Sequence, residues 1–316
     1  MNSIQEKRQI TDTILMVRPV NFRMNEETAV NNYFQEGPQA GNVPINRQAQ
    51  EEFDRFVALL EDHGVRVIAV ADIPEADTPD SIFPNNWVSF HGDGTVCLYP
   101  MFAENRRRER REDIMERLER EGFVIENIMD YTSAETQGVF LEGTGSILMD
   151  RVNQKAYCAL SQRADEDLFI EFCEDFDCFP VPFTARQTVE GKRLPIYHTN
   201  VMMAMAERFV VICLDTVDDK KERKNLVDHL KMDGREIIEI SEAQMYRFAG
   251  NMLQVLGRDG QPFMVMGTAA YSSLRPDQIK AIEKHGPILH SPLDTIERCG
   301  GGSARCMMAE VFLPRA

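Results

Sequence analysis

The sequence predicts an α/β fold in which five similar units, each reading strand, strand, helix, strand, close into a ring. Two observations predict it. Short runs rich in Val, Ile, Phe and Tyr alternate with helical runs throughout the 316 residues. Polar residues at the start of each unit also recur at nearly constant spacing. These five marks are 56, 56, 53 and 55 residues apart, at Asn86, Glu142, His198, Asn251 and Cys306.

The elements of each unit follow in chain order, the strands bounded by Gly, Asp, Asn or Pro and several helices ending at Gly. The predicted strands are Ile14–Val17, Val65–Val70, Trp87–Phe90, Thr95–Tyr99, Phe123–Ile128, Ser146–Met149, Ala156–Leu160, Phe209–Cys213, Glu236–Ile240, Met252–Leu256, Phe263–Met266 and Met307–Phe312. The predicted helices are Gln48–His63, Arg106–Glu121, Asp165–Asp175, Asp218–Met232 and Pro276–His285.

The last unit has only its first strand, and its missing strand, helix and strand lie at the N-terminus. We therefore expect the two ends to complete one unit and residues 1–316 to form a single domain. Equivalent positions of such a ring converge on one axis, so the five marks are expected to meet. The alternative is that the spacing is coincidental, because βα units of this length are common.

Composition excludes several classes of protein. Hydrophobic residues make up 43% and charged residues 27% of the chain, which are ordinary values for a globular protein. The net charge of −16 argues against a nucleic-acid partner, which usually requires a basic face. The run from Glu104 to Glu121 contains seven Arg and seven acidic residues and is interpreted as a solvated amphipathic helix.

No secretory signal precedes the first strand, and no apolar run approaches the ~18 residues of a membrane span. The seven Cys are scattered without a Cys-x-x-Cys pair. This pattern favours free thiols in a reducing, cytoplasmic compartment over disulfides or structural zinc. We expect no membrane partner, no metal and no cofactor, and leave a homo-oligomer open.

Three of the marks have the chemistry of an activated nucleophile. Cys306 follows the run Gly300–Arg305, whose glycines allow close backbone approach, and Arg305 beside it favours the thiolate. His198 has a pKa suited to acid–base work, and Glu142, among small and apolar neighbours, needs a partner such as an imidazolium. Taken singly, a cysteine is more often a buried hydrophobe and a histidine more often structural.

At these residues the sequence resembles the pentein superfamily of guanidine-modifying enzymes. The motifs that carry the resemblance are FPNN (83–86), LEG (141–143), HTN (198–200) and GGGSARC (300–306), and MVRPVNF, FPNNWVSFH, LEGTGS and GGGSARCM are most similar to the citrulline utilization hydrolase branch. The resemblance implies a five-bladed β/α propeller. It also implies Cys306 as nucleophile, His198 as acid/base and Glu142 as its partner.

Two positions depart from the deiminases of that superfamily, which commonly have Asp where this chain has Asn86 and Asn200. A carboxylate only accepts hydrogen bonds, whereas an Asn amide also donates. Two lost charges weaken the binding of a guanidinium, and a neutral ureido group suits an amide better. The succinylarginine dihydrolases, which act on a guanidinium, nevertheless share the first Asn.

Further substrate-binding candidates come from loops expected on the same face. An Arg there can hold a substrate carboxylate, although a surface ion pair is an equal alternative for each. The stretch Pro19–Asn46 is long enough to be a lid. The candidates are Arg18, Asn21, Arg23, Asn85, Gln162, Arg163 and Arg305.

The predicted function is therefore a Cys-dependent hydrolase of a ureido or guanidino C–N bond, acting on citrulline to give ornithine, carbon dioxide and ammonia. The alternatives are a guanidine deiminase or dihydrolase, an amidinotransferase acting on arginine-like substrates, and a non-catalytic binding module with the same fold.

Overall fold

Five three-stranded sheets organise the part of the chain that the computed structural model describes, residues 8–37 and 45–316. Each sheet has a middle strand that is antiparallel to one neighbour and parallel to the other. The sheets are β3 (Val88–Phe90), β4 (Thr95–Leu98) and β5 (Asn127–Asp130); β6 (Ile147–Asp150), β7 (Lys155–Ala159) and β8 (Phe179–Phe183); β11 (Met203–Met205), β12 (Phe209–Ile212) and β13 (Glu236–Glu239); β14 (Leu253–Leu256), β15 (Pro262–Gly267) and β16 (Ile288–Ser291); and β17 (Ala309–Glu310), β1 (Thr13–Arg18) and β2 (Arg66–Ala71).

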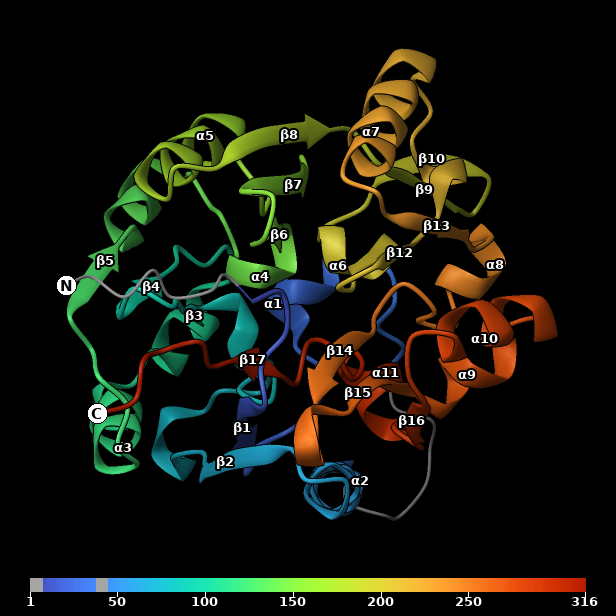
Figure 1. Ribbon diagram of the computed structural model, residues 1–316. Coiled ribbons are helices and arrows are strands. Elements are labelled where there is room, and N and C mark those ends of the chain that lie inside the picture. The colour runs from blue at the N-terminus through green and yellow to red at the C-terminus, as the bar shows by residue number, and fades with distance from the viewer. Residues whose placement is uncertain (1–7, 38–44) are drawn as a thin grey trace, which may run out of the picture.

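A helix connects the two parallel strands of every sheet, because parallel neighbours require a long crossover. These helices lie around the rim in Figure 1 and are α2 (Ile45–Asp62), α3 (Glu112–Arg120), α5 (Glu166–Asp175), α7 (Lys220–Met232) and α10 (Pro276–Glu283). Their buried faces are apolar; Phe53, Phe56 and Leu60 of α2 are an example. None of the described helices is long and apolar enough to cross a membrane.

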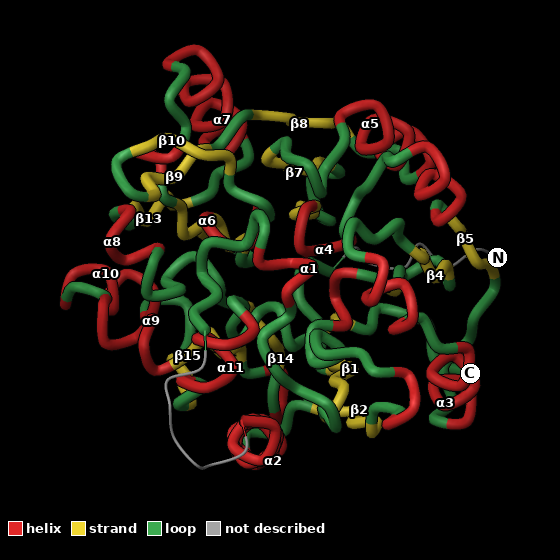
Figure 2. The backbone as a smooth tube through the Cα atoms, turned by 180° about the vertical axis from the view of Figure 1, so that it is seen from behind, coloured by secondary structure: helices red, strands yellow, loops and turns green. Residues whose placement is uncertain are grey.

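Short helices occupy the remaining connections. They are α1 (Glu26–Ala29), α4 (Gly143–Ser146), α6 (Thr199–Met202), α8 (Glu242–Met245), α9 (Thr268–Ser273) and α11 (Asp294–Gly300). Both views place α1 beside α4 near the middle of the molecule (Figures 1 and 2). Because α4 and α6 directly precede β6 and β11, the starts of these first strands bring polar residues to the centre.

The sheet β17-β1-β2 joins segments from opposite ends of the chain. Ile14 pairs with Glu310 in an antiparallel arrangement and with Val67 in a parallel one. The last strand therefore brings the segment that contains Cys306 next to the first strand.

Three predicted elements differ from the structure. The helix predicted over Arg106–Glu121 is divided into a 3₁₀ segment, Glu104–Glu109, and α3, because Arg110 and Arg111 are extended. The strand predicted over Phe123–Ile128 is shifted to β5, since Phe123 instead forms a bridge to Arg315.

The strand predicted over Met307–Phe312 is reduced to the two residues of β17, because a tight turn occupies residues 304–307. A hairpin of β9 (Arg186–Val189) and β10 (Lys192–Pro195) was not predicted. Its turn residues Glu190 and Gly191 both have positive φ, as a tight hairpin turn requires.

Candidate active site

The Cys306 thiol lies between two asparagine amides. Its Sγ is 3.2 Å from Nδ2 of Asn251 and 3.5 Å from Nδ2 of Asn200, and the side chain is buried. Burial raises the pKa of the Cys306 thiol, and the Asn251 hydrogen bond opposes this only in part. The resting group at neutral pH is therefore a thiol held by two N–H donors, which also suit a thiolate.

The glycines before Cys306 allow neighbouring groups to pack against the backbone. A Cβ on Gly300 or Gly302 would lie 2.8 or 3.0 Å from the ring of Phe83. Gly301 ends α11 with φ +64, and its carbonyl oxygen accepts a hydrogen bond of 2.7 Å from the Tyr197 hydroxyl. The run is therefore a close-packed support for Cys306.

Glu142 and His198 form a buried pair at the starts of α4 and α6. His198 Nε2 is 2.7 Å from Glu142 Oε2, and Glu142 Oε1 accepts the backbone N–H of Phe102. Since a carboxylate only accepts, Nε2 carries the proton and Nδ1 is left with its lone pair. The neutral ring can then serve as a base through Nδ1.

Electrostatics keep this pair as a carboxylate and a neutral ring. Burial raises the pKa of Glu142, but the nearby Arg163 charge and the His198 hydrogen bond outweigh it and lower the pKa to about 2. Burial lowers the pKa of His198 to about 4, against the opposing effect of Glu142. Both values lie well below neutral pH, so Glu142 is charged and His198 is not.

The amide of Asn86 has a fixed orientation. Arg106 Nη1 donates to Asn86 Oδ1 at 2.8 Å, and Arg106 is itself buried and paired with Glu109. Because a guanidinium has no acceptor, this bond requires the amide oxygen to face Arg106. Asn86 Nδ2 therefore faces the other way, buried and without a hydrogen-bond partner.

Gly145 shows how closely the Asn86 amide and the His198 ring approach one another. A Cβ at Gly145 would lie 2.3 Å from Asn86 Nδ2 and 2.9 Å from His198 Nδ1. The second glycine of Gly143-Thr144-Gly145 is therefore needed for space. Asn86 Nδ2, which has no hydrogen-bond partner, and His198 Nδ1, which carries no proton, therefore both lie next to Gly145.

The structure thus brings together Asn86, Glu142, His198, Asn200 and Cys306. Among the described contacts there is no hydrogen bond between His198 and Cys306; the two are connected through Asn200, two residues after His198. Asn85 is adjacent and buried, and neither side-chain atom has a partner.

The other predicted substrate-binding residues make contacts elsewhere. Arg18 pairs with Asp54 at 2.7 Å and is exposed, while Asn21 donates to the carbonyl oxygen of Pro74. Arg305 binds Glu310 and the carbonyl oxygen of Met308. None of these side-chain hydrogen bonds reaches the cluster.

Arg163, Arg23 and Gln162 are also engaged. Arg163 lies 3.5 Å from Glu142 and donates to Asn31 and the carbonyl oxygen of Thr28, so it supports Glu142. Arg23 pairs with Asp77, and Gln162 accepts a hydrogen bond from Asn31. Residues 38–44 of the predicted lid lie outside the described residues.

Two residues of the site had no predicted role. Asn251 was expected to meet the other marks because it has the same spacing, but no function was assigned to it. Arg106 had no such signal, because its charged neighbours suggested a solvated helix. In residues 8–37 and 45–316 no group of His, Cys, Asp and Glu is arranged to hold a metal ion.

Comparisons with known proteins agree on one fold. The profile of the family described as N,N dimethylarginine dimethylhydrolase, eukaryotic, matches residues 18–313. Among curated proteins, none is significantly similar to this chain.

Solved structures are similar at low identity. Arginine dihydrolase ArgZ from cyanobacteria gives a TM-score of 0.71 at 18% identity over 96% of this chain, which spans only 41% of the ArgZ chain. A substrate-bound variant of the N-terminal domain of ArgZ gives 0.70 at 18% identity, covering 95% of this chain and 99% of that domain. A dimethylarginine dimethylaminohydrolase adduct with S-methyl-L-thiocitrulline gives 0.64 at 16% identity, covering 95% and 99%. At these identities the likeness shows the fold.

Proposed function

The chain belongs to the N,N-dimethylarginine dimethylhydrolase family of the pentein superfamily, and from this premise we propose that it hydrolyses citrulline to ornithine, carbon dioxide and ammonia. In this proposal residues 1–316 are one domain, a five-bladed β/α propeller in the cytoplasm, and the reaction needs no cofactor. Cys306 is the nucleophile, His198 the acid/base and Glu142 its partner.

The chemistry proceeds through a thioester. The Cys306 sulfur attacks the ureido carbon, and His198 transfers the thiol proton to the δ-nitrogen. The C–N bond breaks to release ornithine and leave a carbamoyl group on sulfur. His198 then takes a proton from water, which attacks this group and restores the thiol. The carbamic acid so released decomposes to carbon dioxide and ammonia.

The observation that carries the substrate choice is the orientation of Asn86. Its unpaired Nδ2 presents a donor, and a ureido oxygen is the matching acceptor. A guanidinium has only N–H donors, so it would face this amide donor to donor. Leaving a buried donor unsatisfied costs about 1–3 kcal/mol, which favours the ureido group.

A second candidate is an arginine dihydrolase activity. The observation that favours it is Asp80, a buried carboxylate beside Arg106 whose Oδ1 has no hydrogen-bond partner. Such an oxygen is suited to a cationic group of the substrate, either the guanidinium of arginine or the amino group of either amino acid.

The test measures ornithine, citrulline and ammonia released from citrulline and from arginine. We expect ornithine and ammonia from citrulline, and a loss of at least ~10³-fold in Cys306→Ala, because the thioester cannot form. Asn86→Asp should shift the preference toward arginine, whereas Asn127→Asp, an exposed change of the same charge, should not.

The outcomes separate the candidates. Faster turnover of arginine to ornithine by the unaltered enzyme would replace citrulline hydrolysis with dihydrolase activity. Citrulline accumulating from arginine would indicate a deiminase, and a requirement for an added amine would indicate an amidinotransferase. Full activity in Cys306→Ala would overturn the mechanism.

A further inference from the structure

A pocket of about 610 Å³ lies at the opposite end of the first strands from the Cys306 cluster. Asn86 precedes β3 and His91 follows it; Glu142 precedes α4 and β6, and Arg151 follows them. Each residue of a strand advances it by about 3.3 Å, so even these short strands separate the two sites. The pocket is of the size that holds small organic molecules.

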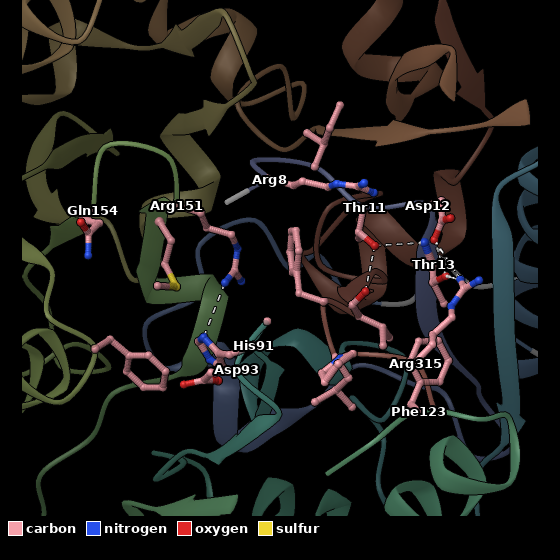
Figure 3. Close-up of a pocket in the computed structure, with 18 of the residues that line it drawn as sticks. Arg8, Thr11, Asp12, Thr13, His91, Asp93, Phe123, Arg151, Gln154 and Arg315 are labelled. Carbon is pink, nitrogen blue, oxygen red and sulfur yellow. Dashed lines mark hydrogen bonds and ion pairs between the residues drawn. The ribbon is translucent and has the colours of Figure 1, made fainter. Parts of the chain in front are cut away.

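The pocket combines an apolar lining with arginine side chains. Ile10, Met149, Phe312 and Leu313 contribute apolar surface. The arginines come from three directions: Arg8 before β1, Arg151 after β6 and Arg315 from the C-terminal segment (Figure 3). This charge stands out because the whole chain carries a net charge of −16.

The carboxylates of the lining are engaged by other groups. Asp12 pairs with Arg315 at 3.2 Å and also accepts from Thr13. Asp93 accepts the backbone N–H of Thr95 within its turn. Of the three arginines, only Arg315 forms an ion pair with a described residue.

Arg151 forms no ion pair with a described residue: burial lowers the pKa of its guanidinium, and the charge of Glu310 opposes this only in part. Its guanidinium carbon lies 4.0 Å from the centre of the Phe312 ring, and its Nη1 is 3.5 Å from His91 Nδ1 (Figure 3). Burial and the charge of Arg151 lower the pKa of His91, so this ring is neutral and acts as an acceptor. No carboxylate of residues 8–37 and 45–316 lies within 4.0 Å of the guanidinium, and most of its five donors remain available.

The buried arginines among the described residues pair with carboxylates, whereas the half-buried Arg151 does not. Arg235 pairs with Asp150, the residue before Arg151, at 2.7 Å, and Arg305 pairs with Glu310 at 3.0 Å. The two nearest acidic groups on β6 and β17 are therefore already used.

We propose that this pocket binds a small organic anion, a carboxylate or phosphate whose charge is held by Arg151 and whose apolar part lies against the pocket's apolar lining. A guanidinium with a stacked face and free edge is suited to hold either oxyanion through two parallel hydrogen bonds. The site is separate from the Cys306 cluster and does not rest on the reaction proposed for it.

Calorimetric titration with phenyl phosphate and with benzoate tests the proposal, with neutral benzamide as the uncharged probe. We expect saturable binding of at least one anion, weaker at high salt, and at least tenfold weaker binding of benzamide. Arg151→Met should reduce anion binding at least tenfold. Arg47→Met, which removes an exposed, paired arginine of α2, should leave it unchanged.

Four results would overturn the proposal: binding unchanged in Arg151→Met, binding abolished by Cys306→Ser, equal binding of benzamide, or absence of binding by both anions. The relative affinities of the two probes decide between phosphate and carboxylate. Should Arg151→Met fail to fold, Arg8→Ala provides the second variant, since Arg8 is exposed and makes no ion pair with a described residue. It should weaken anion binding about threefold, and an unchanged affinity would count against the site.

Discussion

Buried and half-buried charges are paired differently at the two ends of β3 and β6. At the Cys306 end, the buried charges Glu142, Arg163 and Arg106 have ion-pair partners. The atoms without a hydrogen-bond partner there include a neutral donor, Asn86 Nδ2, and one oxygen of Asp80, whose other oxygen is bound by Asn25. At the other end, Arg151 has no carboxylate partner among the described residues, so its guanidinium charge is not paired. The difference shows that burial alone does not decide what a site will bind; the unpaired group decides it.

The largest effect should come from removing the carboxylate charge of Glu142 at the Cys306 end. In Glu142→Gln, His198 loses its anionic partner and Arg163 keeps only its hydrogen bonds to Asn31 and Thr28, so we expect kcat to fall by ~10²–10³-fold. Removing one partner of a buried pair also destabilises the fold, by about 3–5 kcal/mol. Ammonia release from citrulline and thermal unfolding measure the two effects.

Asp93→Asn is the matched control at the pocket end, where the same chemical change should alter kcat less than twofold. Equal losses in the two variants would show that the paired charges at Glu142 have no special role.

A methyl group sharpens the same comparison. Gly145→Ala places a Cβ against Asn86 Nδ2 and His198 Nδ1, so we expect a loss of ~10²-fold in kcat from displacing groups by about 1 Å. Gly92→Ala in the pocket meets only the carbonyl oxygen of Phe312, at 3.9 Å, and should be tolerated. Steady-state kinetics of both variants decide; a tolerated Gly145→Ala would mean that the ring and amide can separate without loss.

The reactivity of the Cys306 thiol should increase with pH. Burial raises the pKa of Cys306, so the thiolate fraction is small at neutral pH and rises about tenfold per unit below that pKa. We expect the rate of inactivation by iodoacetamide to keep rising through pH 9, with Cys306→Ala correcting for the other cysteines. A plateau below pH 8 would show that the site lowers the pKa instead.

The smallest effect should come from Arg18, which belongs to neither end. Its ion pair with Asp54 is exposed and contributes about 0–1 kcal/mol to stability. Arg18→Ala should therefore leave kcat and KM within twofold and shift unfolding only slightly. A tenfold rise in KM for citrulline would instead indicate that Arg18 binds the substrate carboxylate, as the sequence suggested.

Sequence patterns predict site residues only where those residues belong to the repeated unit. Asn86, Glu142, His198, Asn251 and Cys306 each lie two to five residues before the first antiparallel strand of a sheet, so a nearly constant spacing reveals them together. Arg106 is found by no such rule, because its burial depends on contacts with Asn86 and Asp80 about twenty residues earlier in the chain.

The pocket around Arg151 escapes prediction for a related reason. Its lining comes from turns after β3 and β6, from residues before β1 and from the C-terminal segment, and turns carry no periodicity. In sequence, Arg151 stands in an ordinary polar turn between two strands. Only the spatial arrangement shows that the carboxylate beside it, Asp150, is already paired with Arg235.

The pairing of Ile14 with Glu310 has a consequence for biosynthesis. A contact across nearly 300 residues cannot form until the later strand has left the ribosome, and closing so long a loop is slow. Cys306, the proposed nucleophile, lies four residues before Glu310 and emerges at almost the same moment. A nascent chain therefore carries an incomplete sheet and an incomplete Cys306 cluster until translation has passed this strand, so that the sheet and the cluster are completed together.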